Sequence, residues 1–111
     1  MTDARIDAAM MEQLKELLGE RFTELVDRFI QDGERRLGLL REALKTQDFV
    51  AIHAEAHGLK GSSRNIGANI LGGLCSDLEQ MGKENKAEGL QTVFAALEQE
   101  FAAVCAELRT W

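Results

Sequence analysis

One histidine, His57, lies in the middle of a predicted helix, with Lys60 three residues later and Arg64 seven residues later. A helix turns by about 100° per residue, so these three side chains share one stripe of its surface. Neutral imidazole is a nucleophile near neutral pH, and the two cations can offset the charge of an anion attached to it. This combination favours phosphoryl transfer, which depends mainly on positioning and charge neutralisation.

Two glycines, Gly58 and Gly61, fall next to this cationic stripe. Each glycine inside a helix costs roughly 1 kcal/mol relative to alanine. We interpret both as a low, smooth surface on which a partner can bring its backbone or a reactive group up to His57. Close packing of two helices through glycine is the alternative, and Gly58 lies far from the predicted core face of its helix.

The ring of His57 needs a partner that holds one nitrogen so that the other presents its lone pair. A turn at Gly67 would fold the next helix back along the first, which places Glu79 or Gln80 beside His57. We choose Glu79 as the acceptor of the Nδ1–H, and the alternative is a solvated surface acid. The chain has no phosphate-binding loop and no second base at useful spacing, so we expect a phosphoryl carrier that is not an enzyme.

Apolar spacing predicts an all-α protein with five helices, over residues 6–18, 20–44, 49–66, 69–83 and 87–109. Short connections favour antiparallel neighbours, so residues 20–109 should form an up-down four-helix bundle, with residues 1–18 as an additional N-terminal helix over one end or side. Gly33 and Gly38 weaken the second helix, where we allow for a kink or break. We expect Leu17 and Ile70 to lie on the apolar, core-facing sides of their helices.

The composition limits the remaining choices. The chain has 111 residues, 45% of them hydrophobic, which is enough for one domain with one core. A net charge of -6 makes nucleic acid an unexpected partner. There is no apolar run of membrane-spanning length and no signal-peptide pattern, so we expect a cytoplasmic protein. An acidic bundle with one core and one docking face is expected to be a monomer. Cys75 and Cys105 should be reduced core thiols, and the hydroxyl of Ser63 should bond to a backbone carbonyl.

The run HGLKG at residues 57–61, followed by Gly67, is similar to the H-x-L-K-G-x(5)-G signature of histidine-containing phosphotransfer (HPt) domains. The next helix also resembles that of the family, at Leu71, Leu74, Cys75, Leu78 and Glu79. The resemblance implies a helical bundle that relays phosphate between aspartates of response-regulator receiver domains. It implies a free-standing module without a kinase or ATP-binding domain, which receives phosphate from a receiver, often one on a hybrid sensor kinase.

The resemblance also implies roles for individual residues. His57 would be phosphorylated on Nε2, Lys60 would lie near the phosphate, and Gly61 would keep the ring accessible. Glu79 lies where some members carry glutamine, and an acid there would hold the Nδ1–H but repel a nearby phosphoryl group. No cofactor is expected on this chain, and the partner receiver domain would supply Mg²⁺.

Two other functions remain as alternatives. His53 and His57 have the i, i+4 spacing of a metal site, but Glu55 points away from them on the helical wheel, and a third ligand would have to come from Glu79 or another helix. A non-catalytic helical interaction module would explain the bundle and the acidic charge. It would leave the cationic stripe and the adjacent glycines unexplained.

Overall fold

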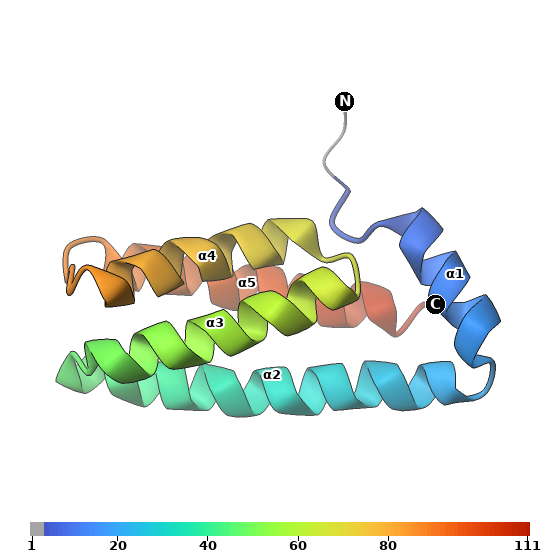
Figure 1. Ribbon diagram of the computed structural model, residues 1–111, viewed down its shortest axis with the longest axis horizontal. Helices are drawn as coiled ribbons and strands as arrows, with labels where there is room; N and C mark the ends of the chain where they lie inside the picture. The colour runs from blue at the N-terminus through green and yellow to red at the C-terminus, as the bar shows by residue number, and fades with distance from the viewer. Residues whose placement is uncertain (1–3) are drawn as a thin grey trace.

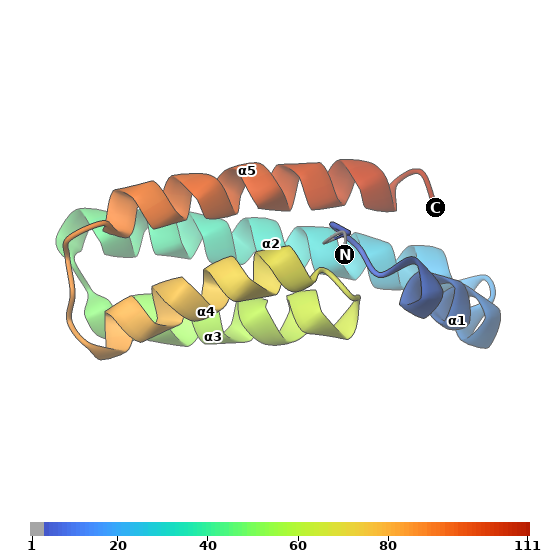
Figure 2. The ribbon, with the colours of Figure 1, turned by 90° about the horizontal axis from the view of Figure 1, so that it is seen from above.

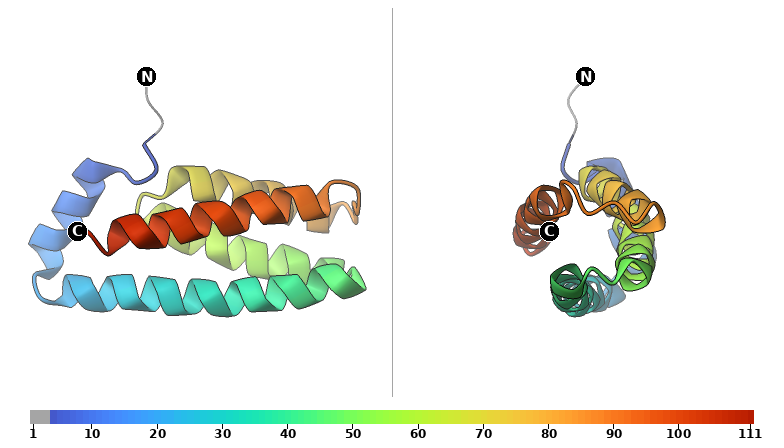
Figure 3. Two further views of the ribbon diagram at one scale, coloured as in Figure 1. Left: turned by 180° about the vertical axis from the view of Figure 1, so that it is seen from behind. Right: turned by 90° about the vertical axis from the view of Figure 1, so that its left-hand side faces the viewer.

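The computed structural model describes residues 4–111, which form five helices and no strand (Figure 1). The helices are α1 (Ala8–Leu18), α2 (Arg21–Thr46), α3 (Phe49–Asn65), α4 (Asn69–Lys83) and α5 (Leu90–Leu108). Helices α2 to α5 run up and down beside one another, and the end-on view in Figure 3 shows them as four packed columns. The all-α class and the antiparallel four-helix bundle are therefore confirmed.

Helix α1 lies across the end of the bundle where α2 begins and α5 ends (Figure 2). The backbone N–H of Asp7 donates to the carbonyl of Gly67 in the α3–α4 turn, at 3.0 Å. The ammonium of Lys15 donates to the carbonyl oxygen of Trp111 at 2.6 Å. These contacts hold α1 over the end of the bundle, one of the two positions expected for it.

Local capping explains where two helices begin later than their apolar spacing predicts. Helix α1 begins at Ala8 because the carboxylate of Asp7 accepts a hydrogen bond from the backbone N–H of Met10, at 3.1 Å. Helix α5 begins at Leu90 because Gly89 has φ +84°, a left-handed conformation that stops a helix from extending backward. The bounds of α4 are those predicted from the sequence.

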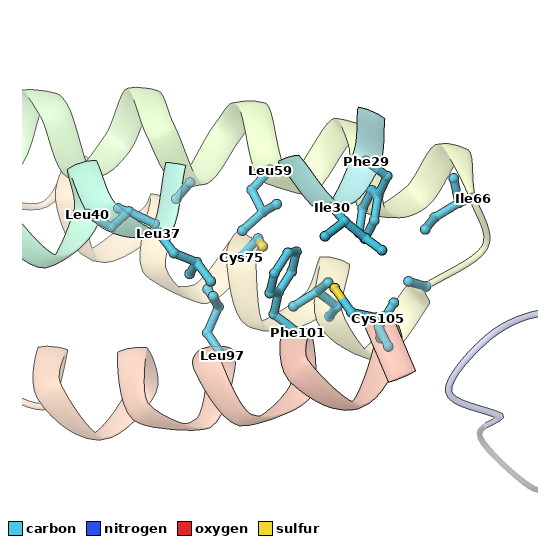
Figure 4. Close-up of a cluster of buried hydrophobic side chains, with 14 of the residues drawn as sticks. Phe29, Ile30, Leu37, Leu40, Leu59, Ile66, Cys75, Leu97, Phe101 and Cys105 are labelled. Atoms are coloured by element: carbon cyan, nitrogen blue, oxygen red, sulfur yellow. The ribbon is translucent and has the colours of Figure 1, made fainter. Parts of the chain in front are cut away.

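The core fills the space between the four bundle helices with aliphatic and aromatic side chains (Figure 4). Phe29 of α2 and Phe101 of α5 meet with ring centroids 5.7 Å apart. Helix α2 runs unbroken past Gly33 and Gly38, so the break allowed for there is absent. Gly33 has a packing role instead, since a Cβ added to it would overlap the ring of Phe101.

Three expectations about side chains are wrong. Leu17 is 80% exposed, because α1 lies across the bundle end and packs on it through Met11, Leu14 and Leu18. Ile70, in the first turn of α4, is 37% exposed. The buried hydroxyl of Ser63 makes no hydrogen bond to a backbone carbonyl and lies against the thiol of Cys75, whereas its neighbour Ser62 donates to the carbonyl of Leu59 at 3.2 Å.

Both cysteines are free thiols in the core, as expected. Burial raises the pKa of the Cys75 thiol to about 12 and that of the Cys105 thiol to about 11. Both are therefore protonated and unreactive near neutral pH. Of the helices within residues 4–111, none combines the length and the apolar character needed to cross a bilayer.

Candidate functional site

Helix α3 presents His57 to solvent from its middle. The carboxylate of Asp48 begins the helix by accepting a hydrogen bond from the backbone N–H of Ala51, at 3.1 Å. Ala56 and Leu59 are fully buried and anchor one face of α3 in the core. The side chain of His57 emerges beside that face and is 65% exposed.

Glu79 of α4 holds the imidazole of His57. The turn at Gly67, with φ +78°, makes α4 run back along α3 and brings the two side chains together. The distance from His57 Nδ1 to Glu79 Oε2 is 2.9 Å. A carboxylate can only accept, so the hydrogen lies on Nδ1 and the lone pair on Nε2. Gln80 is exposed and donates to Glu84 instead, at 3.0 Å, so Glu79 is the neighbour of His57.

The ammonium of Lys60 turns toward the same acid. Its Nζ lies 2.5 Å from Glu79 Oε1, and the two side chains are 21% and 15% exposed. This short, charge-assisted contact pairs the second, buried oxygen of the carboxylate with Lys60. Lys60 and the Nδ1–H of His57 together hold the pKa of Glu79 below its usual value, against the opposing effect of burial.

Gly61 and Arg64 occupy the exposed surface that continues along α3 from His57. A Cβ added to Gly61 would meet no atom of the protein within 4 Å, so this glycine leaves open space, as expected. The aliphatic stem of Arg64 lies over Gly72 of α4, where an added Cβ would be 3.0 Å from Arg64 Cγ. Among the ion pairs of residues 4–111, none includes Arg64.

Gly58 has a different surrounding from the one predicted. A Cβ added there would overlap the guanidinium of Arg36, which reaches across from α2. That guanidinium donates to Asp32 and to Glu55, at 2.9 Å each. The interpretation of Gly58 as a bare docking surface is therefore wrong, because the side chain of Arg36 covers this glycine. A helical wheel gives the direction of a residue but not the reach of a long side chain on the next helix.

His53, one turn before His57, is also held by Glu79. The distance from its Nδ1 to the backbone carbonyl oxygen of Glu79 is 3.2 Å. The rings of His53 and His57 are nearly parallel, with an interplanar angle of 13° and centroids 6.4 Å apart. Within residues 4–111, no group of three or more His, Cys, Asp or Glu side chains is arranged to hold a metal ion.

Comparisons with known proteins give a consistent result. The family model of the Hpt domain matches residues 24–107. Histidine-containing phosphotransfer protein B (HptB) from Pseudomonas aeruginosa PAO1 is 30% identical, with a TM-score of 0.93 over 98% of this chain and 95% of that chain. The histidine-containing phosphotransfer protein ZmHP2 from maize is 27% identical, with a TM-score of 0.85 over 96% of this chain and 88% of that chain. The comparison with curated proteins gives no significant match.

Proposed function

The chain belongs to the Hpt domain family, and from that premise we propose that His57 is the residue on which it carries a phosphoryl group. The protein is a phosphocarrier of a phosphorelay, and proteins of this kind are carriers and not kinases. The observation that supports the choice of His57 is its exposed ring, with Nδ1 bonded to Glu79 and Nε2 free.

The proposed transfer is a single displacement at phosphorus. The Nε2 lone pair of His57 forms a bond to the phosphorus of an aspartyl phosphate as the bond between phosphorus and the aspartate oxygen breaks. The carboxylate stays on the receiver domain as the leaving group. The phosphorylated ring keeps its Nδ1 hydrogen and so gains positive charge, which the carboxylate of Glu79 stabilises, as a buried acid does for other catalytic imidazoles.

Lys60 balances the charge of that acid. An unpaired carboxylate next to His57 would repel the anionic phosphoryl group, but the ammonium of Lys60 lies directly against the other oxygen of Glu79. We therefore assign Lys60 as a positioning residue that acts through Glu79, in place of the direct phosphate contact expected from the family resemblance. Arg64 lies on the exposed face of α3 and is the cation that we assign to the phosphoryl oxygens.

Receiver domains are the partners of phosphorelay carriers. We propose that the receiver docks over His57 and Gly61, where the surface of α3 is open. It would supply Mg²⁺, and this chain would need no cofactor. We further propose that the protein is a cytoplasmic monomer whose phosphate comes from the receiver of a hybrid sensor kinase.

The test is transfer of labelled phosphate from a phosphorylated receiver domain to the purified chain. We expect label on the wild type that is acid-labile and base-stable, as in phosphohistidine, and none on His57→Gln. The matched control is His53→Gln, which removes the other histidine of the chain and should keep the label. Circular dichroism checks that both variants fold. Receiver binding without any label would favour the helical interaction module, and label retained by His57→Gln would move the site elsewhere.

A further inference from the structure

Two imidazoles are held by one residue, Glu79. Its carboxylate oxygen Oε2 is 2.9 Å from His57 Nδ1, and its backbone carbonyl oxygen is 3.2 Å from His53 Nδ1. Both acceptors lack hydrogens, so each ring carries its hydrogen on Nδ1 when neutral. Each ring therefore has a lone pair on Nε2.

Both imidazole rings reach the surface of the protein. His57 is 65% exposed. His53 is half-buried and lines an open groove of about 450 Å³ beside the end of α4. The nearly parallel rings, with an interplanar angle of 13°, both have Nδ1 directed at Glu79. Both Nε2 atoms therefore lie on the side of the rings away from that residue.

We propose that Nε2 of His53 and Nε2 of His57 chelate an exchangeable divalent transition-metal ion, and that the bound ion blocks phosphorylation of His57. Histidines at i and i+4 on one helix face are a recurring pair of metal ligands. A metal-binding histidine almost always donates its other N–H to a carboxylate or a backbone carbonyl, and these two histidines have one of each. Glu79 thus supplies the hydrogen-bond acceptors for the Nδ1 atoms of both histidines.

The geometry indicates moderate affinity. A tetrahedral ion about 2.0–2.1 Å from each nitrogen requires the two Nε2 atoms to lie about 3.4 Å apart. The ring centroids are 6.4 Å apart, so both rings must tilt toward each other on binding. No third protein ligand is arranged within the described part of the chain, so water would complete the coordination. Two imidazoles and water suit Cu²⁺, Ni²⁺ and Zn²⁺ better than Mg²⁺ or Ca²⁺.

The two parts of the proposal differ in what they assume. Binding of the ion follows from the two imidazoles alone. Inhibition rests on the proposed function, because Nε2 of His57 cannot bond to a metal ion and to phosphorus at the same time. The ion would therefore compete with the phosphoryl donor, and removing it with a chelator would restore acceptance.

The binding experiment titrates Ni²⁺ into the full, tag-free chain by calorimetry in a buffer without phosphate. We expect one ion per chain, with affinity reduced more than about 10-fold in His53→Gln and in His57→Gln, because each variant leaves one histidine. Ni²⁺ is chosen over Cu²⁺ because it undergoes no redox reaction with the protein. Equal affinity in the wild type and in either variant would overturn the site.

The inhibition experiment uses phosphoramidate as a small phosphoryl donor, with phosphohistidine followed by ³¹P NMR. Labelling of the wild type without metal tests the proposed function separately from the metal site. We expect Ni²⁺, at a concentration that fills the wild-type site but not the weaker site of His53→Gln, to suppress labelling of the wild type and to leave labelling of His53→Gln nearly unchanged. Equal suppression in both proteins, or full labelling of the Ni²⁺-saturated wild type, would refute the competition.

Discussion

Replacing Gly61 with alanine separates the stability of α3 from the docking of a partner. Gly61 lies one turn after His57, and nothing in the protein approaches within 4 Å of the position of an added Cβ. Alanine is favoured over glycine inside a helix by about 1 kcal/mol. The free energy of unfolding should therefore increase by about 0.5–1 kcal/mol, and the melting temperature by roughly 2–6 °C.

The same substitution should slow transfer from a receiver domain. If the receiver backbone approaches α3 over Gly61, a methyl group displaces it, and a misplacement of about 1 Å at a reacting centre costs up to about 100-fold in rate. Phosphoramidate is small and needs no docking surface, so labelling by this donor should keep its wild-type rate. Both rates can be measured on the same protein preparation, together with urea denaturation.

Gly38→Ala is the matched control for Gly61→Ala. Gly38 lies inside α2, and an added Cβ there also meets no atom within 4 Å. It should show the same gain in stability with no change in either transfer rate. If Gly61→Ala gains stability and keeps its transfer rate from the receiver, the docking role of Gly61 is refuted. If Gly61→Ala loses stability, the open space over α3 is itself wrong.

Three further predictions test the packing of the site and of the core. Glu79→Gln should lower the free energy of unfolding by about 1–2 kcal/mol at pH 7. The folded-state pKa of Glu79 is depressed, so this stability is present above the ordinary pKa of about 4.3 and is lost as pH falls below it. Urea denaturation at pH 7 and pH 3 measures the difference, and Lys60→Ala should cost less in the Glu79→Gln background than alone. Gly58→Ala should raise the free energy of unfolding by less than about 1 kcal/mol, because the new methyl group displaces Arg36. When Arg36 is also replaced by alanine, Gly58→Ala should give the full increase. Equal increases in both backgrounds would contradict the contact. Gly33→Ala should lower the free energy of unfolding by about 2 kcal/mol in thermal denaturation, because its methyl group overlaps an aromatic ring of α5; a gain there would disprove the close packing.

The order of the helices and one contact of the site were predictable because they depend on spacing along the chain. Apolar periodicity predicts five helices, and the bounds of α4 agree with the structure. The pairing of His57 with Glu79 follows from counting residues on either side of the turn at Gly67 in an antiparallel pair. Such counting needs only the rise per residue of a helix and the position of its end.

Contacts made by long or buried side chains were not predictable in this way. Arg36 reaches Gly58 from a neighbouring helix because its guanidinium extends several bonds from the α2 backbone. The hydroxyl of Ser63 does not bond to a backbone carbonyl, although serines in helices commonly bond to a preceding carbonyl, as Ser62 does. His53 belongs to the site through the backbone carbonyl of Glu79, an acceptor that every residue has and that carries no sequence signal.

The acid at position 79 illustrates why the charge of a site has to be judged from contacts and not from residue types. On the sequence alone, Glu79 helps His57 through its Nδ1–H and opposes it by repelling the phosphoryl group. The structure places the ammonium of Lys60 on the second oxygen of that carboxylate, so the charges of Lys60 and Glu79 cancel before phosphate arrives. The oxygen of Glu79 that faces His57 can then stabilise the positive charge of the phosphorylated ring, while the neighbouring ammonium reduces the repulsion between the carboxylate and the phosphoryl group. The side-chain oxygen of a glutamine at position 79 would accept the same hydrogen bond from His57 and would carry no charge for Lys60 to balance. Replacing Glu79 and Lys60 together should therefore disturb the site less than the two single replacements added together.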